Sequence, residues 1–196
     1  MEYIRNHKNV MWNMENKIIM LSKLGKYRLA YSYVMAALVI TFTQEDLLYP
    51  GIIMMIIGAA IRIWAAGYIM KQDVLALEGP YSYTRNPLYL GSFIAALGAL
   101  ILTMNWWLTP IFITGFAIFY GGKIRSEEDF LRDKFGDEFD EYVRNVPVFI
   151  PRFTPYRKSQ EYSFSWRMVL HNNEHHSILY TIGLLLVIML VAYLKR

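Results

Sequence analysis

The chain has 196 residues, of which 55% are hydrophobic and only 18% are charged, and it contains no cysteine. Its apolar residues gather into runs long enough to cross a bilayer, which excludes an ordinary soluble domain, and the lack of cysteine excludes disulfides and thiolate metal sites. The net charge of +4 comes from basic residues interleaved with acids, and a face toward anionic lipid headgroups explains it at least as well as nucleic acid does, so we expect a lipid bilayer and no nucleic acid as the partner. The first 20 residues are too polar for a cleaved signal peptide, so we expect them to stay on the mature protein.

Five apolar segments predict membrane-spanning helices, so the predicted fold class is all-α, a polytopic transmembrane bundle of about five helices. They cover about residues 28–43, 49–70, 88–104, 106–121 and 178–194. A turn at Asn105 alone separates the third and fourth, and about 17 residues barely cross a bilayer core, so a shallow hairpin is the alternative for this pair. Small residues, among them Gly58, Gly91 and Ala95, predict closely packed helices. Because no repeat or linker divides the chain, we expect a single membrane-embedded domain over residues 1–196.

Lysine and arginine counts predict the orientation in the membrane. Residues 1–28 contain six and residues 123–176 contain nine, whereas the short connections at 44–48 and at Asn105 contain none. The positive-inside rule therefore places the N-terminus and the long segment 123–176 in the cytoplasm, and the loop 71–87 falls on the same side. We expect a cytoplasmic catalytic face, and the compact length without targeting signals favours a bacterial inner membrane.

Arg62 lies inside the second apolar segment, nine residues before Lys71 at the expected membrane edge. Nine residues of helix span about 13 Å, too far for the arginine to reach the surface easily, so its side chain should face a partner within the bundle. One interpretation is a structural ion pair with a glutamate elsewhere in the chain. The other is the anionic group of a bound cofactor or substrate.

The loop before the third segment is rich in aromatic and basic residues. A turn at Gly79–Pro80 opens it, and Pro87 suits the first turn of the helix that follows. Arginine can hold a carboxylate bidentately, and tyrosine faces attract a cation such as a sulfonium. The residues with these properties are Tyr81, Tyr83, Arg85 and Tyr89. An interfacial loop with aromatic anchors is the alternative.

A second polar segment begins at Ser126, which with Asp129 has the spacing of a capping box and predicts a helix start. Glu127 and Glu128 follow, beside one apolar stripe at helical spacing made of Leu131, Phe135, Phe139, Tyr142 and Val146. These carboxylates could accept hydrogen bonds from ribose hydroxyls or pair with an amino group. Alternatively they only stabilise the dipole of the predicted helix.

The sequence His171-Asn-Asn-Glu174-His175 matches the H-x-x-E-H pattern of one zinc peptidase class. Two histidines four residues apart on a helix can share a metal ion, with the glutamate as general base. A third ligand would have to come from elsewhere, and a polar lead-in to the last helix is the simpler interpretation.

Taken together, these segments resemble the membrane methyltransferases that include isoprenylcysteine carboxyl methyltransferase and the phospholipid N-methyltransferases. The family pattern resembles G-P-Y-x-x-x-R-[HN]-P-x-Y, a glutamate pair, F-G-x-x-[FY]-x-x-Y and V-P-x-x-x-P. Here these motifs stand at 79–89, 127–128, 135–142 and 146–151, within a cofactor-binding core of about residues 55–152. The order and spacing of four motifs make the resemblance specific.

The resemblance implies that S-adenosylmethionine is the cofactor and that it is held without a Rossmann domain. The residues that it carries over are Arg85, Asn86, Pro87, Tyr89, Glu127 and Glu128, of which we predict Arg85, Glu127 and Glu128 as catalytic. To the cofactor site we add Arg62 and Gly58, from their depth and helical position, and Tyr81 and Tyr83, whose aromatic faces attract a sulfonium. Asn86 departs from the eukaryotic isoprenylcysteine enzymes, which have histidine there, and an asparagine cannot exchange a proton.

The predicted function is S-adenosylmethionine-dependent methyl transfer to a lipid-like acceptor, such as a prenylcysteine-type carboxylate or a related isoprenoid group, at the cytoplasmic membrane face. A membrane reductase that uses NADPH is the nearest alternative, because sterol reductases look similar in this C-terminal region. Those enzymes favour an acid pair with a nearby cysteine, which this chain lacks. A zinc peptidase that uses His171, Glu174 and His175 and a non-enzymatic lipid-binding scaffold are further alternatives.

Overall fold

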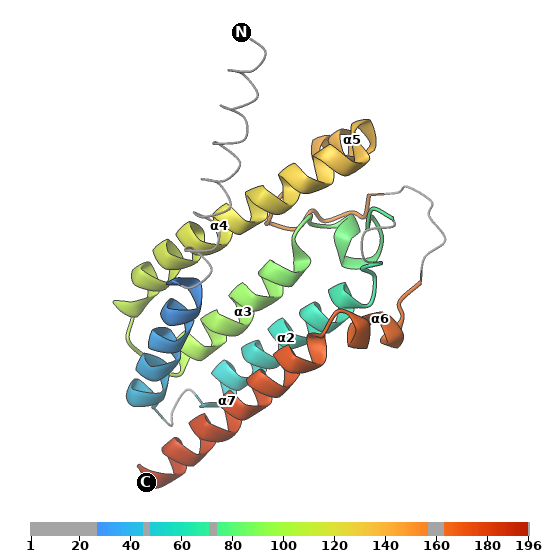
Figure 1. Cartoon of the computed structure of the whole chain (residues 1–196). Helices are drawn as coiled ribbons and strands as arrows, with labels where there is room; N and C mark the ends of the chain where they lie inside the picture. Colours follow the sequence, from blue (N-terminus) through green and yellow to red (C-terminus); the bar gives the residue numbers. More distant parts are fainter. Residues whose placement is uncertain (1–26, 45–47, 71–73, 157–162, 196) are drawn as a thin grey trace, which may run out of the picture.

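The computed structural model describes residues 27–44, 48–70, 74–156 and 163–195. Every regular element in these ranges is helical, which confirms the predicted all-α class for them (Figure 1). The elements are a helix Tyr27–Phe42, α2 (Leu48–Ala66), the 3-10 helix η1 (Gly79–Ser82), α3 (Pro87–Ile101), α4 (Leu108–Phe135), α5 (Asp137–Asn145), α6 (Trp166–His171) and α7 (Glu174–Leu194). Most of the N-terminal basic residues used for the orientation, and Lys71, lie outside the described residues.

Two described helices are long and apolar enough to cross a membrane, namely Tyr49–Ala66 within α2 and all of α7. The helix Tyr27–Phe42 and α3 are apolar but shorter, so the predicted number of five spanning helices is not confirmed. The 15 residues of α3 rise about 22 Å, less than the roughly 30 Å of a hydrocarbon core. In α4, charged residues fill the second half, so its apolar part is only half of the helix.

Helices α2 and α3 pack closely against each other because glycines face one another along their contact. A Cβ atom on Gly91 would lie 2.6 Å from the carbonyl oxygen of Gly58, and one on Gly98 would lie 2.7 Å from that of Gly51. Rising residue numbers on one helix thus meet falling numbers on the other, so the two run antiparallel (Figure 1). The close packing predicted from the small residues is confirmed for this pair.

The predicted helix start at Ser126 is wrong. Helix α4 runs without interruption from Leu108 to Phe135, so Ser126 lies in its interior and caps nothing. The residues before it continue the helix across Gly121 and Gly122, and a capping-box pattern alone cannot distinguish a helix start from a helix interior. The glutamate pair therefore sits on a rigid helix that extends past the apolar bundle.

The apolar stripe after the glutamates is divided between two helices. Gly136 adopts a positive φ of 51°, which ends α4 and lets α5 begin at Asp137 at a new angle. The stripe residues still pack together, in one buried cluster with Leu75 and Leu77 from the segment after α2. The grouping predicted from helical spacing is therefore confirmed, although one continuous helix does not carry it.

Candidate active site

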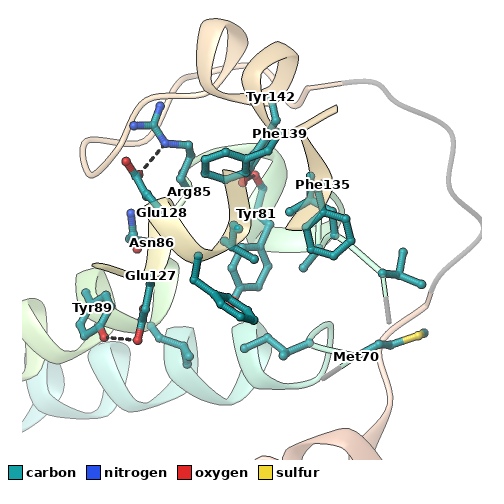
Figure 2. A pocket seen from close by; sticks show the side chains of 17 residues that line it. Met70, Tyr81, Arg85, Asn86, Tyr89, Glu127, Glu128, Phe135, Phe139 and Tyr142 are labelled. Carbon is teal, nitrogen blue, oxygen red and sulfur yellow. Dashed lines mark hydrogen bonds and ion pairs between the residues drawn. The ribbon is translucent and has the colours of Figure 1, made fainter. Parts of the chain in front are cut away.

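A cavity of about 330 Å³ lies where α4 and α5 cover the loop before α3 (Figure 2). Small-molecule sites in proteins typically enclose about 300–1,000 Å³, so this one is of the size needed for a cofactor. Its polar side chains gather on one side and its aromatic side chains on the other (Figure 2). The polar set is Arg85, Asn86, Tyr89, Glu127 and Glu128, and the opposite side includes Met70, Tyr81, Phe135 and Phe139.

The loop that carries Arg85 and Asn86 is held by backbone hydrogen bonds to the chain after α5. Arg85 N–H donates to the Pro147 carbonyl at 2.9 Å. In return, Arg152 N–H donates to Tyr83 and Tyr156 N–H donates to Ser82, each also at 2.9 Å. This pairing explains why a V-P-x-x-x-P segment accompanies the Arg-Asn-Pro loop, since each supplies the partners of the other.

Side chains of the same loop add to this attachment. Asn86 Nδ2 donates to the Val148 carbonyl at 3.0 Å, and Thr84 Oγ1 donates to the Phe149 carbonyl at 3.0 Å. Asn86 is buried and lines the cavity, yet its amide group bonds to backbone. Pro87 follows as the first residue of α3, where its missing N–H leaves no helical hydrogen bond unmade.

Arg85 ties the loop to both covering helices. Its Nε donates to Glu128 Oε1 at 2.8 Å, and its Nη1 donates to the carbonyls of Val143 and Val146 at 3.1 and 2.7 Å. These carbonyls lie at the C-terminal end of α5, where backbone acceptors lack helical partners and a guanidinium is a favourable cap. Both members of the ion pair are largely buried, with side chains 12% and 18% exposed. Arg85 thereby fixes α4 and α5 relative to the loop.

Glu127 links α4 to α3 and is more open to solvent than its neighbour. Its Oε1 accepts a hydrogen bond from the Tyr89 hydroxyl at 2.9 Å (Figure 2). The same oxygen lies 3.2 Å from Lys123 Nζ. The Glu127 side chain is 42% exposed, so it can exchange partners more easily than Glu128. The two adjacent carboxylates therefore differ: one is bound to a buried arginine, and the other faces the cavity beside a phenol and an ammonium group.

Two buried tyrosines close the aromatic side. The Tyr142 hydroxyl donates to the Tyr81 carbonyl at 2.7 Å. Burial raises the pKa of both phenols well above the usual value of 10, and this effect exceeds the lowering by the nearby guanidinium groups, Arg62 for Tyr81 and Arg85 for Tyr142. Both groups therefore stay protonated at any physiological pH, so neither is suited to act as a general base.

The predicted site residues divide into two groups. Six of them line the cavity together: Tyr81, Arg85, Asn86, Tyr89, Glu127 and Glu128. The other four are not among its lining residues. Pro87 starts α3, and the ring of Tyr83 faces Trp64 at 6.5 Å between centroids. Arg62 and Gly58 lie on α2 within the bundle.

Arg62 forms the ion pair that one interpretation of its position predicts. Its Nη2 lies 2.6 Å from Glu174 Oε1 and its Nε donates to Glu174 Oε2 at 3.1 Å, a two-point contact between α2 and α7. The same guanidinium donates to Ser92 Oγ, to the Leu88 carbonyl at 3.3 Å and to Ser177 Oγ at 3.0 Å. The glutamate of the H-x-x-E-H pattern is thus bound to an arginine. Among the described residues, no group of three or more His, Cys, Asp or Glu side chains is placed to hold a metal ion.

Sequence reasoning missed one wall of the cavity, which residues 69–70 and 74–76 form between α2 and η1. Its lining residues include Ile69, Met70, Leu75 and Ala76. Leu75 is buried against Phe139 and Tyr142. The only signal in the sequence is the short apolar run around Leu75, which is too brief to distinguish a wall from a connecting loop.

Comparison with known proteins identifies the family of this site. The phospholipid methyltransferase family model matches residues 47–138, which include six polar or aromatic lining residues from Tyr81 to Glu128. The nickel-cobalt-cadmium resistance protein NccN of Alcaligenes xylosoxydans xylosoxydans is 34% identical over 149 residues, which cover 71% of this chain and 70% of that protein. The chain belongs to the phospholipid methyltransferase family. It is a methyltransferase, as the sequence predicts.

Other relatives match shorter parts. The cobalt-zinc-cadmium resistance protein CzcN of Cupriavidus metallidurans is 33% identical over 144 residues, covering 69% of this chain and 66% of that protein. The protein-S-isoprenylcysteine O-methyltransferase of Schizosaccharomyces pombe is 38% identical over 81 residues, covering 41% of this chain and 34% of the yeast enzyme. The chain thus spans about a third of that enzyme's length. No solved structure matches the chain significantly.

Proposed function

We propose that the cavity binds S-adenosylmethionine and that the protein transfers its methyl group to a lipid-like acceptor at the cytoplasmic membrane face. The observation that carries this proposal is the gathering of Arg85, Glu127 and Glu128 around one cavity, with Arg85 and Glu128 joined by a largely buried ion pair. They come from the loop before α3 and from α4, both inside the matched family region.

The residues present fit this cofactor. S-adenosylmethionine has a charged amino-acid end and ribose hydroxyls, which suit the polar side of the cavity, and a flat adenine, which suits the aromatic side. Glu127 can accept hydrogen bonds from hydroxyl or amino groups, and the Tyr81 ring can face a cation. In Arg85, the Nη2 group takes part in none of the three side-chain hydrogen bonds described above, so it keeps its donors for a carboxylate.

The chemistry asks the protein mainly to position two reactants. The bound sulfonium supplies a methyl group that is already activated, so the residues need to hold the acceptor in line with it and to exclude water. A carboxylate or thiolate acceptor needs no base. An amine acceptor must lose a proton, and Glu127 is the better candidate to take it because Glu128 is bound to Arg85.

A second cavity supports a lipid-like acceptor. It encloses about 350 Å³ among the helix Tyr27–Phe42, α2, α3, α4 and α7, and its lining is apolar apart from a few hydroxyl groups. Tyr120 lines it, and the ring of Tyr120 contacts that of Tyr89, which lines the first cavity, at 5.6 Å between centroids. A hydrocarbon chain in the second cavity would place its headgroup near the first.

The decisive experiment is calorimetric titration of the full-length protein in detergent with S-adenosylmethionine and S-adenosylhomocysteine. We expect Arg85→Ala and Glu128→Gln to weaken binding by about tenfold or more, as the loss of a charged hydrogen bond of about 1.5–3 kcal/mol implies. The matched control is Arg132→Ala, which breaks an exposed ion pair with Asp140 (2.9 Å). This pair also joins α4 to α5, but it lies outside the cavity. Absence of binding by folded wild-type protein, with NADPH bound in its place, would refute the proposal.

The acceptor class is tested by a methylation screen in vesicles. We expect transfer to a prenylcysteine analogue with a free carboxylate, and Glu127→Gln should leave that rate within a few-fold of wild type. If phosphatidylethanolamine is the acceptor instead, the same substitution should abolish transfer, because the amine then keeps its proton. Binding of the cofactor by Glu127→Gln, measured in parallel, separates an effect on proton transfer from an effect on affinity.

A further inference from the structure

The segment from Pro147 to Tyr156, here called the strap, carries three large apolar side chains that nothing in the described fold covers. Phe153 is fully exposed, Ile150 is 78% exposed and Val148 is 41% exposed. Large exposed apolar groups that lie close together in a protein usually mark a contact with a membrane or a partner. Backbone hydrogen bonds hold the strap in place, so these side chains have a fixed position on the surface.

Hydrogen bonds fix which side of the strap faces outward. Its backbone is held to the loop before α3 at Pro147, Arg152 and Tyr156, with N···O distances of 2.9 Å. In the stretch between the first two attachments, Phe149 points inward, and its ring lies 5.5 Å from Phe93 and 6.0 Å from Phe116 between centroids. The residues on either side of Phe149 therefore point away from the bundle.

The contact with Phe93 gives the level of the strap along the bundle. Phe93 lies six residues into the apolar helix α3, about 9 Å from its start at Pro87. Figure 1 shows the segment after α5 running back between α4 and the start of α3. Outward-pointing side chains at this level meet the boundary between lipid headgroups and hydrocarbon if α2 and α7 cross the bilayer. Arg152, between the two most exposed apolar residues, adds a positive charge that suits anionic headgroups.

We propose that Val148, Ile150 and Phe153 insert into the headgroup boundary of the bilayer, so that the strap anchors the loop before α3 to the membrane surface. The strap and the loop share their backbone hydrogen bonds, and the Asn86 amide bonds to the Val148 carbonyl at 3.0 Å. Lipid contact at the strap therefore steadies the residues beside the first cavity.

The lack of cysteine in the chain allows a direct test of depth. Single-cysteine variants Ile150→Cys and Phe153→Cys are labelled with an environment-sensitive fluorophore in the full-length protein and placed in nanodiscs of phosphatidylcholine and phosphatidylglycerol. Asp133→Cys, at an exposed position near the end of α4, is the matched control. We expect blue-shifted emission at 150 and 153, with quenching by lipids spin-labelled near the headgroup, and neither effect at 133.

Emission at 150 and 153 equal to that of the control, without lipid quenching, would overturn the proposal. A blue shift without lipid quenching that vanishes at one protein copy per disc would also overturn it, in favour of a second copy as the occupant. Because the replaced side chains are exposed, the thermal midpoint of each unlabelled variant in detergent should match wild type, which confirms that the probes report on a folded protein. No cofactor is added, so the result is independent of the proposed methyl donor.

Discussion

Replacing Arg62 or Glu174 by leucine removes one partner of an ion pair that joins α2 to α7 inside the bundle. Two contacts of 2.6 and 3.1 Å join the side chains, which are 23% and 9% exposed. Loss of one partner of such a buried pair leaves the other charge unpaired and typically costs about 3–5 kcal/mol. Arg62→Leu should lie toward the upper end of this range, because the glutamate that it leaves behind is the more buried of the two. After Glu174→Leu, Arg62 still donates to Ser92, Ser177 and the Leu88 carbonyl.

The double variant Arg62→Leu/Glu174→Leu tests whether the two residues act as a pair. With both charges removed, no buried charge is left without a partner, so we expect it to be more stable than either single variant. The free energy of unfolding is measured by tryptophan fluorescence in detergent with increasing denaturant. A double variant whose loss equals the sum of the two single losses would refute the coupling and with it the interpretation of the contact as structural.

The same variants decide between the two interpretations of Arg62. Arg62 is absent from the lining of the first cavity, so we expect the double variant to bind S-adenosylmethionine within a few-fold of wild type at a temperature where it is folded. Loss of binding by a folded double variant would show that the guanidinium also serves the cofactor.

Three further predictions concern packing, the loop and pH. Gly91→Ala places a Cβ atom 2.6 Å from a backbone oxygen and should destabilise the protein by about 1–3 kcal/mol in denaturant unfolding. Gly122→Ala is the control: the space around this residue is open, so the change should be neutral or should stabilise the protein by up to about 1 kcal/mol. Arg85→Lys keeps the charge, but a single ammonium group cannot cap α5 and pair with Glu128 of α4 at once. Calorimetry should therefore show weakened cofactor binding. An affinity equal to that of wild type would contradict the role of Arg85 in joining the two helices. The raised pKa of Tyr142 means that its contribution to stability is complete below about pH 10 and is lost as the pH rises further. Tyr142→Phe should lower the free energy of unfolding at pH 8 by about 1–3 kcal/mol, because it leaves the Tyr81 carbonyl unpaired. Above about pH 10 the variant should lose less of its stability than wild type does in the same unfolding assay, because it has no phenol to ionise at this position.

The sequence was most informative where the signal was local. Apolar runs predicted the helices Tyr27–Phe42, α2, α3 and α7 to within a few residues, because burial in a bundle or bilayer requires such runs. The same runs could not fix how many helices cross the membrane. A helix crosses the bilayer only if it is long enough, and α3 is shorter than α2 and α7, which are both long enough.

Local sequence patterns could not identify the contact partners of residues that lie far apart in the sequence. The depth of Arg62 predicted that a partner exists, but Glu174 lies 112 residues away and was interpreted as part of a polar lead-in to the last helix, with a metal motif as the alternative. Arg85 was expected to bind a ligand carboxylate directly. In the structure its first partners are Glu128, 43 residues away, and the carbonyls that end α5, none of which its own motif predicts.

The error at Ser126 shows why the glutamate pair is suited to a site. A helix that began at Ser126 would join the bundle through a flexible connection, and its first-turn acids would be placed only by that connection. Because α4 is continuous, Glu127 and Glu128 are fixed by the same helix that packs Phe112 and Phe116 into the bundle core. The covering helix α5 begins only at the turn at Gly136, so its position depends on contacts made beyond α4. The Arg85 guanidinium supplies two of these contacts, and for this reason its loss should loosen one wall of the cavity as well as remove a charge from it.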